Sequence, residues 1–179
     1  MKVSKEQKKY YEKYSKNLVW KKQSKKIISI DRKENRYYWF DDGVLSPYEN
    51  VITSNLKKKN KDKTAIITVS KNNKIKKYSY YEIDKKVNLI INYFFRLYIS
   101  RKKRVMIHAS ASIESAILML ACAKLGYHFS VIFEDLEEIG LYNRIKLFKP
   151  DIIFTRQKKI KLNINSNKKY KIFDKKDFE

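Results

Sequence analysis

The chain has 179 residues, of which 43% are hydrophobic, so it can bury a core and does not have the composition of a disordered chain. It contains no run of about 18 apolar residues, the length that predicts a membrane-spanning helix. The Lys- and Tyr-rich start, residues 1–16, lacks the apolar core of a secretory signal. A single cysteine, Cys122, excludes an internal disulfide and favours a reducing compartment, so we expect a cytoplasmic protein without a membrane contact.

The formal charge of +23 raises the question of nucleic-acid binding. Only seven of the 42 basic residues are arginine, the type whose planar fork binds phosphate with two hydrogen bonds. The sequence is also rich in Lys, Ile, Tyr, Asn and Phe, which are all written with AT-rich codons. We therefore interpret most of the charge as solvated lysine of an AT-rich genome, and keep a basic nucleic-acid-binding protein as an alternative.

Short helices and strands are predicted for the first third of the chain. Residues 1–26 are polar with apolar residues every three or four positions, which indicates a helix. A short apolar stretch at 27–30 and an aromatic, extended stretch at 36–40 follow. Asp-Asp-Gly at 41–43 is a turn signal, and residues 48–56 have room for one or two helical turns.

The charge run at 57–63 is the expected internal boundary. It precedes a hairpin over residues 64–78, whose strands flank an Asn-containing turn. Ser79 and Glu82 have the spacing of a capping box, which predicts that a helix begins here and runs to about residue 98.

An alternating pattern of strands and helices follows. Gly126 is placed to end a helix in the left-handed conformation, and Pro150 ends the next helix. Short links between these elements predict a parallel sheet. The tail, 157–179, has strand-like patches at 160–164 and 170–173 and is expected to be poorly ordered. The predicted elements are strand 104–109, helix 112–125, strand 128–133, helix 137–148 and strand 151–155.

The same region carries a resemblance to a known family. Residues 120–126, LACAKLG, and 130–133, SVIF, resemble the corresponding segments of acetyl- and propionyl-CoA synthetases in the adenylate-forming superfamily. Residues 38–45, YWFDDGVL, resemble a segment of the N-terminal extension of the short-chain enzymes. The resemblance is collinear from about residue 8 to 156. Further matching positions are Trp20, Gln23, Tyr48, Asn50, 64–67, 78–82, Arg144, Ile145, Lys149 and Pro150.

This resemblance implies an α/β fold: an N-terminal extension plus the first parallel βαβαβ segment of an adenylate-forming large domain, incomplete. It divides the chain into an acetyl-CoA synthetase-type extension, 1–60, the start of the AMP-binding large domain, 61–156, and the tail, 157–179. Three parallel strands with two crossovers leave open edges, which also suggests an incomplete domain.

The family activates a short-chain carboxylate with ATP and Mg²⁺ as an acyl-adenylate and then transfers the acyl group to CoA. Its Ser/Thr/Gly-rich phosphate loop and its catalytic lysine both follow the part that this chain resembles. The chain has only three glycines, Gly43, Gly126 and Gly140, and no two are close enough for such a loop. The resemblance therefore implies ATP and CoA as cofactors of the full enzyme, an inactive chain with no tightly bound cofactor, and no catalytic residue. A separate chain with the rest of a split ligase is an expected partner, and a non-catalytic interaction module derived from a ligase is the further alternative.

Two residues are candidates for CoA binding by resemblance. Phe133 begins a segment that in the family reads FGGF and contacts CoA, although Glu134 and Asp135 replace the glycines with charges that repel phosphate. Arg156 follows the third strand, where the family places arginines for the CoA phosphate. Each also has a structural interpretation, as a charged helix start and as part of a solvated basic run.

Other reactive side chains favour structural roles. No Cys, His or acid pair has metal-ligand spacing around the two histidines, so no metal site is predicted. Ser112 fits a helix N-cap better than a nucleophile, and Cys122 fits a small buried thiol.

Overall fold

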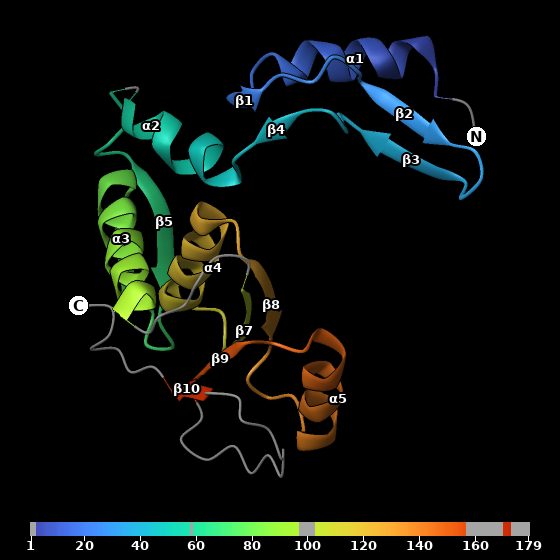
Figure 1. Cartoon of the computed structure of the whole chain (residues 1–179). Coiled ribbons are helices and arrows are strands. Elements are labelled where there is room, and N and C mark those ends of the chain that lie inside the picture. The colour runs from blue at the N-terminus through green and yellow to red at the C-terminus, as the bar shows by residue number, and fades with distance from the viewer. Residues whose placement is uncertain (1–2, 58, 97–102, 157–169, 173–179) are drawn as a thin grey trace.

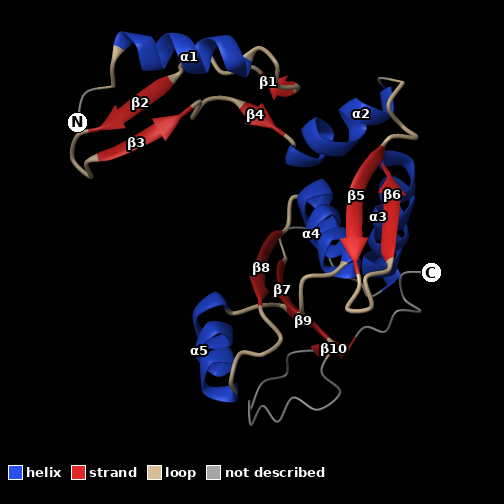
Figure 2. Cartoon of the chain, turned by 180° about the vertical axis from the view of Figure 1, so that it is seen from behind, coloured by secondary structure: helices blue, strands red, loops and turns tan. Residues whose placement is uncertain are grey.

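The structure is a computed structural model that describes residues 3–57, 59–96, 103–156 and 170–172 (Figure 1). An extension of short elements forms one end of the molecule, and a mixed α/β body forms the other, as the view from behind also shows (Figure 2). The expected α/β class is confirmed by the helices and the parallel sheet of this body.

The extension is built from one helix and two small antiparallel sheets. Helix α1, Lys5–Ser15, begins with a capping box in which Ser4 and Gln7 satisfy each other's backbone N–H groups. In the sheets, β1 pairs with β4 and β2 pairs with β3. The strands are β1 (Trp20–Lys22), β2 (Ile28–Asp31), β3 (Arg36–Trp39) and β4 (Val44–Leu45).

The predicted helix over residues 1–26 is wrong beyond Ser15, where α1 ends. The indole of Trp20 donates a hydrogen bond to the Ser15 carbonyl at 2.8 Å, and Trp20 then pairs with Leu45. Gly43 permits this packing, because a Cβ there would lie 2.6 Å from the Trp20 ring. Contacts with residues more than 20 positions away thus override the local helical pattern.

The extension meets the body through a short π-helix, η1, Glu49–Thr53, and helix α2, Ser54–Lys57. Tyr48, which precedes η1, is buried, and its hydroxyl donates to Asp84 Oδ1 at 2.7 Å. Lys124 contacts the same carboxylate at 3.2 Å and lies over the Tyr48 ring, 4.5 Å from its centroid. Asn88 donates to the other carboxylate oxygen at 3.0 Å, so the carboxylate connects three parts of the fold.

The predicted hairpin and capping box are both confirmed. Strands β5, Thr64–Val69, and β6, Ile75–Ser79, pair antiparallel around a turn in which Asn73 adopts a φ of 56°. Helix α3, Tyr80–Arg96, begins where the Ser79 N–H donates to Glu82 at 2.7 Å and the Glu82 N–H donates to the Ser79 hydroxyl at 3.2 Å. The predicted continuation to residue 98 lies outside the described residues.

The body contains a parallel four-stranded sheet in the order β10-β9-β7-β8. Ser112 caps α4, and Gly126, with a φ of 69°, ends it as predicted. Strand β10 lies within the second strand-like patch of the tail, whereas 160–164 lies outside the described residues. The elements are β7 (Arg104–His108), α4 (Ile113–Leu125), β8 (His128–Ile132), α5 (Glu138–Phe148), β9 (Ile152–Thr155) and β10 (Tyr170–Ile172).

Helices cover both faces of the central strands β7 and β9. On one face, Val105 and Ile107 of β7 join a large apolar cluster with side chains of α3 and α4. On the other face, Met106 of β7 and Ile153 of β9 pack with Leu141 of α5 and its neighbours. These continuous apolar runs are typical of buried parallel strands. No helix in the described ranges has the length and apolar character needed to cross a bilayer.

Candidate functional site

The candidate site is the carboxyl edge, which we define as His108, Phe133, Glu134, Thr155 and Arg156. The chain leaves β7 to form β8 on one side and then crosses back over β7 to form β9 on the other side. Helices α4 and α5 accordingly lie on opposite faces of the sheet. In open parallel sheets, such a reversal of strand order creates a crevice at the carboxyl ends, where ligands bind.

Both residues predicted to contact CoA lie at this edge. Phe133 directly follows β8, and its side chain is 69% exposed. Arg156 directly follows β9 and is also exposed. Strand β7 separates their strands, so two strand spacings place their backbones about 10 Å apart. The fold therefore brings together two residues that are 23 positions apart in the sequence, although no direct contact joins them in the structure.

His108 and Thr155 end the two central strands, and both side chains are buried. His108 Nδ1 lies 3.1 Å from the Thr155 hydroxyl, whereas Nε2 has no hydrogen-bond partner in the part of the chain that the structure describes. Burial lowers the pKa of His108, while the Glu134 carboxylate and the Phe133 carbonyl act in the opposite direction. The lowered pKa favours the neutral imidazole at pH 7. The groups that favour the protonated ring, Glu134 and the Phe133 carbonyl, both lie in the segment that follows β8.

The two acids that replace the family's glycines differ in placement. Glu134 is partly buried, and its Oε2 accepts a hydrogen bond from the Ser110 N–H at 3.3 Å. Asp135 is exposed. The sequence left both acids open as charges that repel a phosphate or as a charged helix start, and in the structure Glu134 connects the end of β8 to the turn between β7 and α4. Its partner is 24 positions away, so no local pattern identifies this contact.

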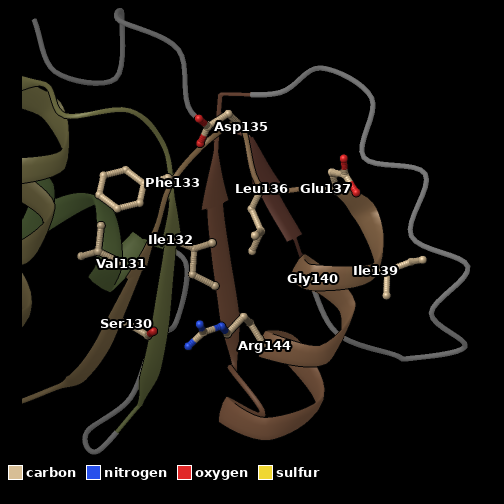
Figure 3. Close-up of a pocket in the computed structure, with 10 residues that line it drawn as sticks. All are labelled: Ser130, Val131, Ile132, Phe133, Asp135, Leu136, Glu137, Ile139, Gly140 and Arg144. Atoms are coloured by element: carbon tan, nitrogen blue, oxygen red, sulfur yellow. The ribbon is translucent and has the colours of Figure 1, made fainter.

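A pocket of about 730 Å³ lies beside the carboxyl edge, between β8 and α5 (Figure 3). Phe133 and Asp135 lie at one end of it and Arg144 at the other, with Ile132 and Leu136 between them. Among the described strands, β8 is paired on one side only, so the pocket follows an open edge of the sheet. Its lining is a mixture of apolar side chains, two acids and one arginine, which suits an amphipathic ligand better than a purely apolar one.

Other reactive groups lie outside this edge or are already used by the fold. Within the described ranges, no group of three or more His, Cys, Asp or Glu side chains could hold a metal ion. Cys122 is buried in the core, and burial raises its pKa to about 12. Ser112 accepts a hydrogen bond from the Ser115 N–H at 3.2 Å, which confirms its role as a helix cap.

The fold matches part of a solved acyl-CoA synthetase. The structure matches acetoacetyl-CoA synthetase from Streptomyces lividans with a TM-score of 0.70 and 15% identity, over 83% of this chain and 22% of that chain. At this identity, the likeness concerns the fold alone.

Sequence comparison defines the family. Residues 53–177 match the family model for the AMP-binding enzyme, and the chain belongs to this family. Acetyl-coenzyme A synthetase of Ralstonia pickettii is 33% identical over 129 residues, covering 72% of this chain and 19% of the relative. That of Leptospira biflexa is 28% identical over 148 residues, covering 82% and 23%. The chain thus spans about a fifth of the length of the curated relatives it matches.

Proposed function

We propose that this chain forms the N-terminal part of an acyl-CoA-ligating unit, which joins a short-chain carboxylate to CoA through an acyl-adenylate. ATP, with Mg²⁺, and CoA are the proposed cofactors of that unit. The observation that carries the proposal is the family match over residues 53–177, together with acetyl-coenzyme A synthetases as relatives. We further propose a cytoplasmic location, to which a single buried thiol is suited.

The chain's own part in this unit is to present the carboxyl edge to CoA. The exposed ring of Phe133 offers a face or edge to the adenine base, because aromatic rings pack favourably in offset or edge-on arrangements. The Arg156 guanidinium offers paired N–H donors to a phosphate. Their spacing of about 10 Å suits a ligand that carries a base at one end and phosphates further along.

Adenylation is assigned to residues outside this sequence. Holding ATP phosphates requires closely spaced backbone N–H groups and hydroxyls, and the three glycines of this chain are at least 14 positions apart. We propose that residues 1–60 form the extension, 61–156 begin the large domain and 157–179 form a tail that leads from it. The proposed partner is a polypeptide with the rest of the ligase, and the chain alone is expected to be inactive.

Exchange of labelled pyrophosphate into ATP in the presence of acetate tests this division. The 179-residue chain is assayed alone and together with the part of the Ralstonia pickettii enzyme that follows the matched segment, with that complete enzyme as the positive control. We expect exchange only in the mixture, with both polypeptides eluting together from a sizing column. Exchange by the chain alone would overturn the assignment of adenylation to other residues. Separate elution without exchange would overturn the proposed assembly.

A further inference from the structure

Strand β8 has the side-chain pattern of an internal strand, although it lies at the end of the described sheet. Phe129 and Val131 are in register with Val105 and Ile107 of β7, which pack against α3 and α4, yet Phe129 and Val131 remain 37% and 42% exposed. On the opposite face, Ile132 is buried against α5. Apolar side chains on both faces are typical of a parallel strand with a neighbour on each side.

The open edge of β8 also lacks the features that keep a free edge from pairing. Such edges usually carry lysine, proline or a bulge. Although 42 of the 179 residues are Lys or Arg, residues 127–133, YHFSVIF, contain no Lys, Arg, Asp, Glu or Pro. The pairing of β8 with β7 runs without a register shift. The outward backbone N–H and C=O groups of β8 are therefore accessible to a further strand.

The charges beside this edge define the chemistry of its occupant. The pocket along β8 has Asp135 at one end and Arg144 at the other, with apolar side chains between them (Figure 3). Neither charge forms an ion pair within the part of the chain that the structure describes. An extended segment that is apolar in its middle, basic beside Asp135 and acidic beside Arg144 complements this lining.

A separate polypeptide suits the edge better than a second copy of the chain. Each copy has a formal charge of +23, so two copies repel one another. The chain also spans only about a fifth of the length of its curated relatives, which leaves most of the ligase to supply such a segment.

We propose that β8 becomes an internal strand of the assembled ligase, because an extended segment of the partner polypeptide pairs with its open edge. The segment has an apolar middle, a basic residue beside Asp135 and an acidic residue beside Arg144. Pairing along residues 128–132 leaves Phe133 and Arg156 available to CoA, since both lie beyond the strand ends. This inference rests on the proposed function, which supplies the partner.

Amide hydrogen exchange at residues 128–132 tests the pairing. The 179-residue chain is measured alone and in the mixture with the part of the Ralstonia pickettii enzyme that follows the matched segment. We expect exchange at these amides to be at least about tenfold slower in the mixture, while the amides of α1 exchange equally in both samples.

The possible failures of this experiment differ. Elution of both polypeptides together without slower exchange in β8 would overturn the pairing and leave the proposed assembly standing. Separate elution would overturn both. Slower exchange in the chain alone as its concentration rises would assign the edge to a second copy and overturn the proposal.

Two pairs of variants test the edge and its charge in the same mixture. Val131→Lys puts a charge on the edge, and Val69→Lys makes the same change at an exposed valine of β5. We expect Val131→Lys to raise the Kd of the mixture at least about tenfold and Val69→Lys less than about twofold. Asp135→Lys should also raise the Kd, whereas Glu6→Lys, at an exposed acid of α1, should not. Equal effects within the first pair would overturn the pairing, and equal effects within the second would overturn the proposed chemistry of the segment.

Discussion

Replacing Asp84 with alanine should destabilise the chain by about 2–4 kcal/mol, because the carboxylate joins the extension to two helices of the body. The buried Tyr48 hydroxyl donates to it at 2.7 Å and would lose this partner, which corresponds to about 1–3 kcal/mol. Lys124 forms an ion pair with it at 3.2 Å, and since both side chains are partly exposed, this pair contributes about 1 kcal/mol. The estimate is the sum of these two terms.

Urea denaturation followed by circular dichroism measures this loss. Asp62→Ala is the matched control, since Asp62 is exposed in the charge run and its removal should change stability by less than about 0.5 kcal/mol. Tyr48→Phe should be destabilising by itself but add little to Asp84→Ala, because both changes remove the same hydrogen bond. If Asp84→Ala has the same urea midpoint as the wild type, or if the losses of stability in Asp84→Ala and Tyr48→Phe add up in the double variant, the Asp84 carboxylate does not stabilise the contact between the extension and the body.

Three further outcomes are expected. Gly43→Ala should destabilise the extension by about 1–3 kcal/mol, because the added Cβ would lie 2.6 Å from the Trp20 ring. Tryptophan fluorescence during urea unfolding measures this loss, and an unfolding midpoint equal to that of the wild type would contradict the close packing. Cys122 should react with a thiol reagent at pH 8 only when the protein unfolds, because the thiol is buried and burial raises its pKa to about 12. Rapid modification of Cys122 in the native chain would contradict this expectation. Burial lowers the pKa of His108 below its usual 6.5, so the unfolded state binds the proton first and the stability of the fold should decrease as the pH falls from about 6.5. Urea denaturation at several pH values should show that the free energy of unfolding falls more steeply with pH in the wild type than in His108→Asn. Equal pH dependence in the two proteins would refute this prediction.

Local signals in the sequence were sufficient for most of the body. The capping box of Ser79 and Glu82 marks the start of α3, and Gly126 marks the end of α4, because both depend on neighbouring residues alone. The alternation of short apolar strands with helices predicts the parallel sheet for the same reason. Here the local preference and the tertiary structure agree.

The extension was predicted only in part: the helical start and the extended stretches at 27–30 and 36–40 correspond to α1, β2 and β3, whereas the end of α1 was not predicted. Residues 16–26 have a helical pattern, yet the chain turns at Ser15 because Trp20 packs against Gly43 and pairs with Leu45. The helical turns predicted over residues 48–56 are confirmed by η1 and α2, but no local signal indicates that the first of them takes the π form. Long-range packing decides both features, and a single sequence does not report it.

The candidate site was predicted in part. The positions of Phe133 and Arg156 at strand ends follow from the strand pattern, since parallel strands share one carboxyl edge. The contacts of Glu134 with Ser110 and of His108 with Thr155 span 24 and 47 positions. They depend on which strands are neighbours in the sheet, and the strand order is not written in the local sequence.

The proposed binding of CoA at the carboxyl edge of the sheet is tested most directly by an amide NMR titration of the 179-residue chain with CoA. Phe133→Ala and Arg156→Gln are compared with Arg36→Gln, which removes an exposed arginine from the extension. We predict weak binding, with shifts concentrated at residues 133–136 and 154–156, that both edge variants reduce and Arg36→Gln does not. Shifts spread over the lysine-rich surface, or equal effects of all three variants, would contradict binding of CoA at the carboxyl edge.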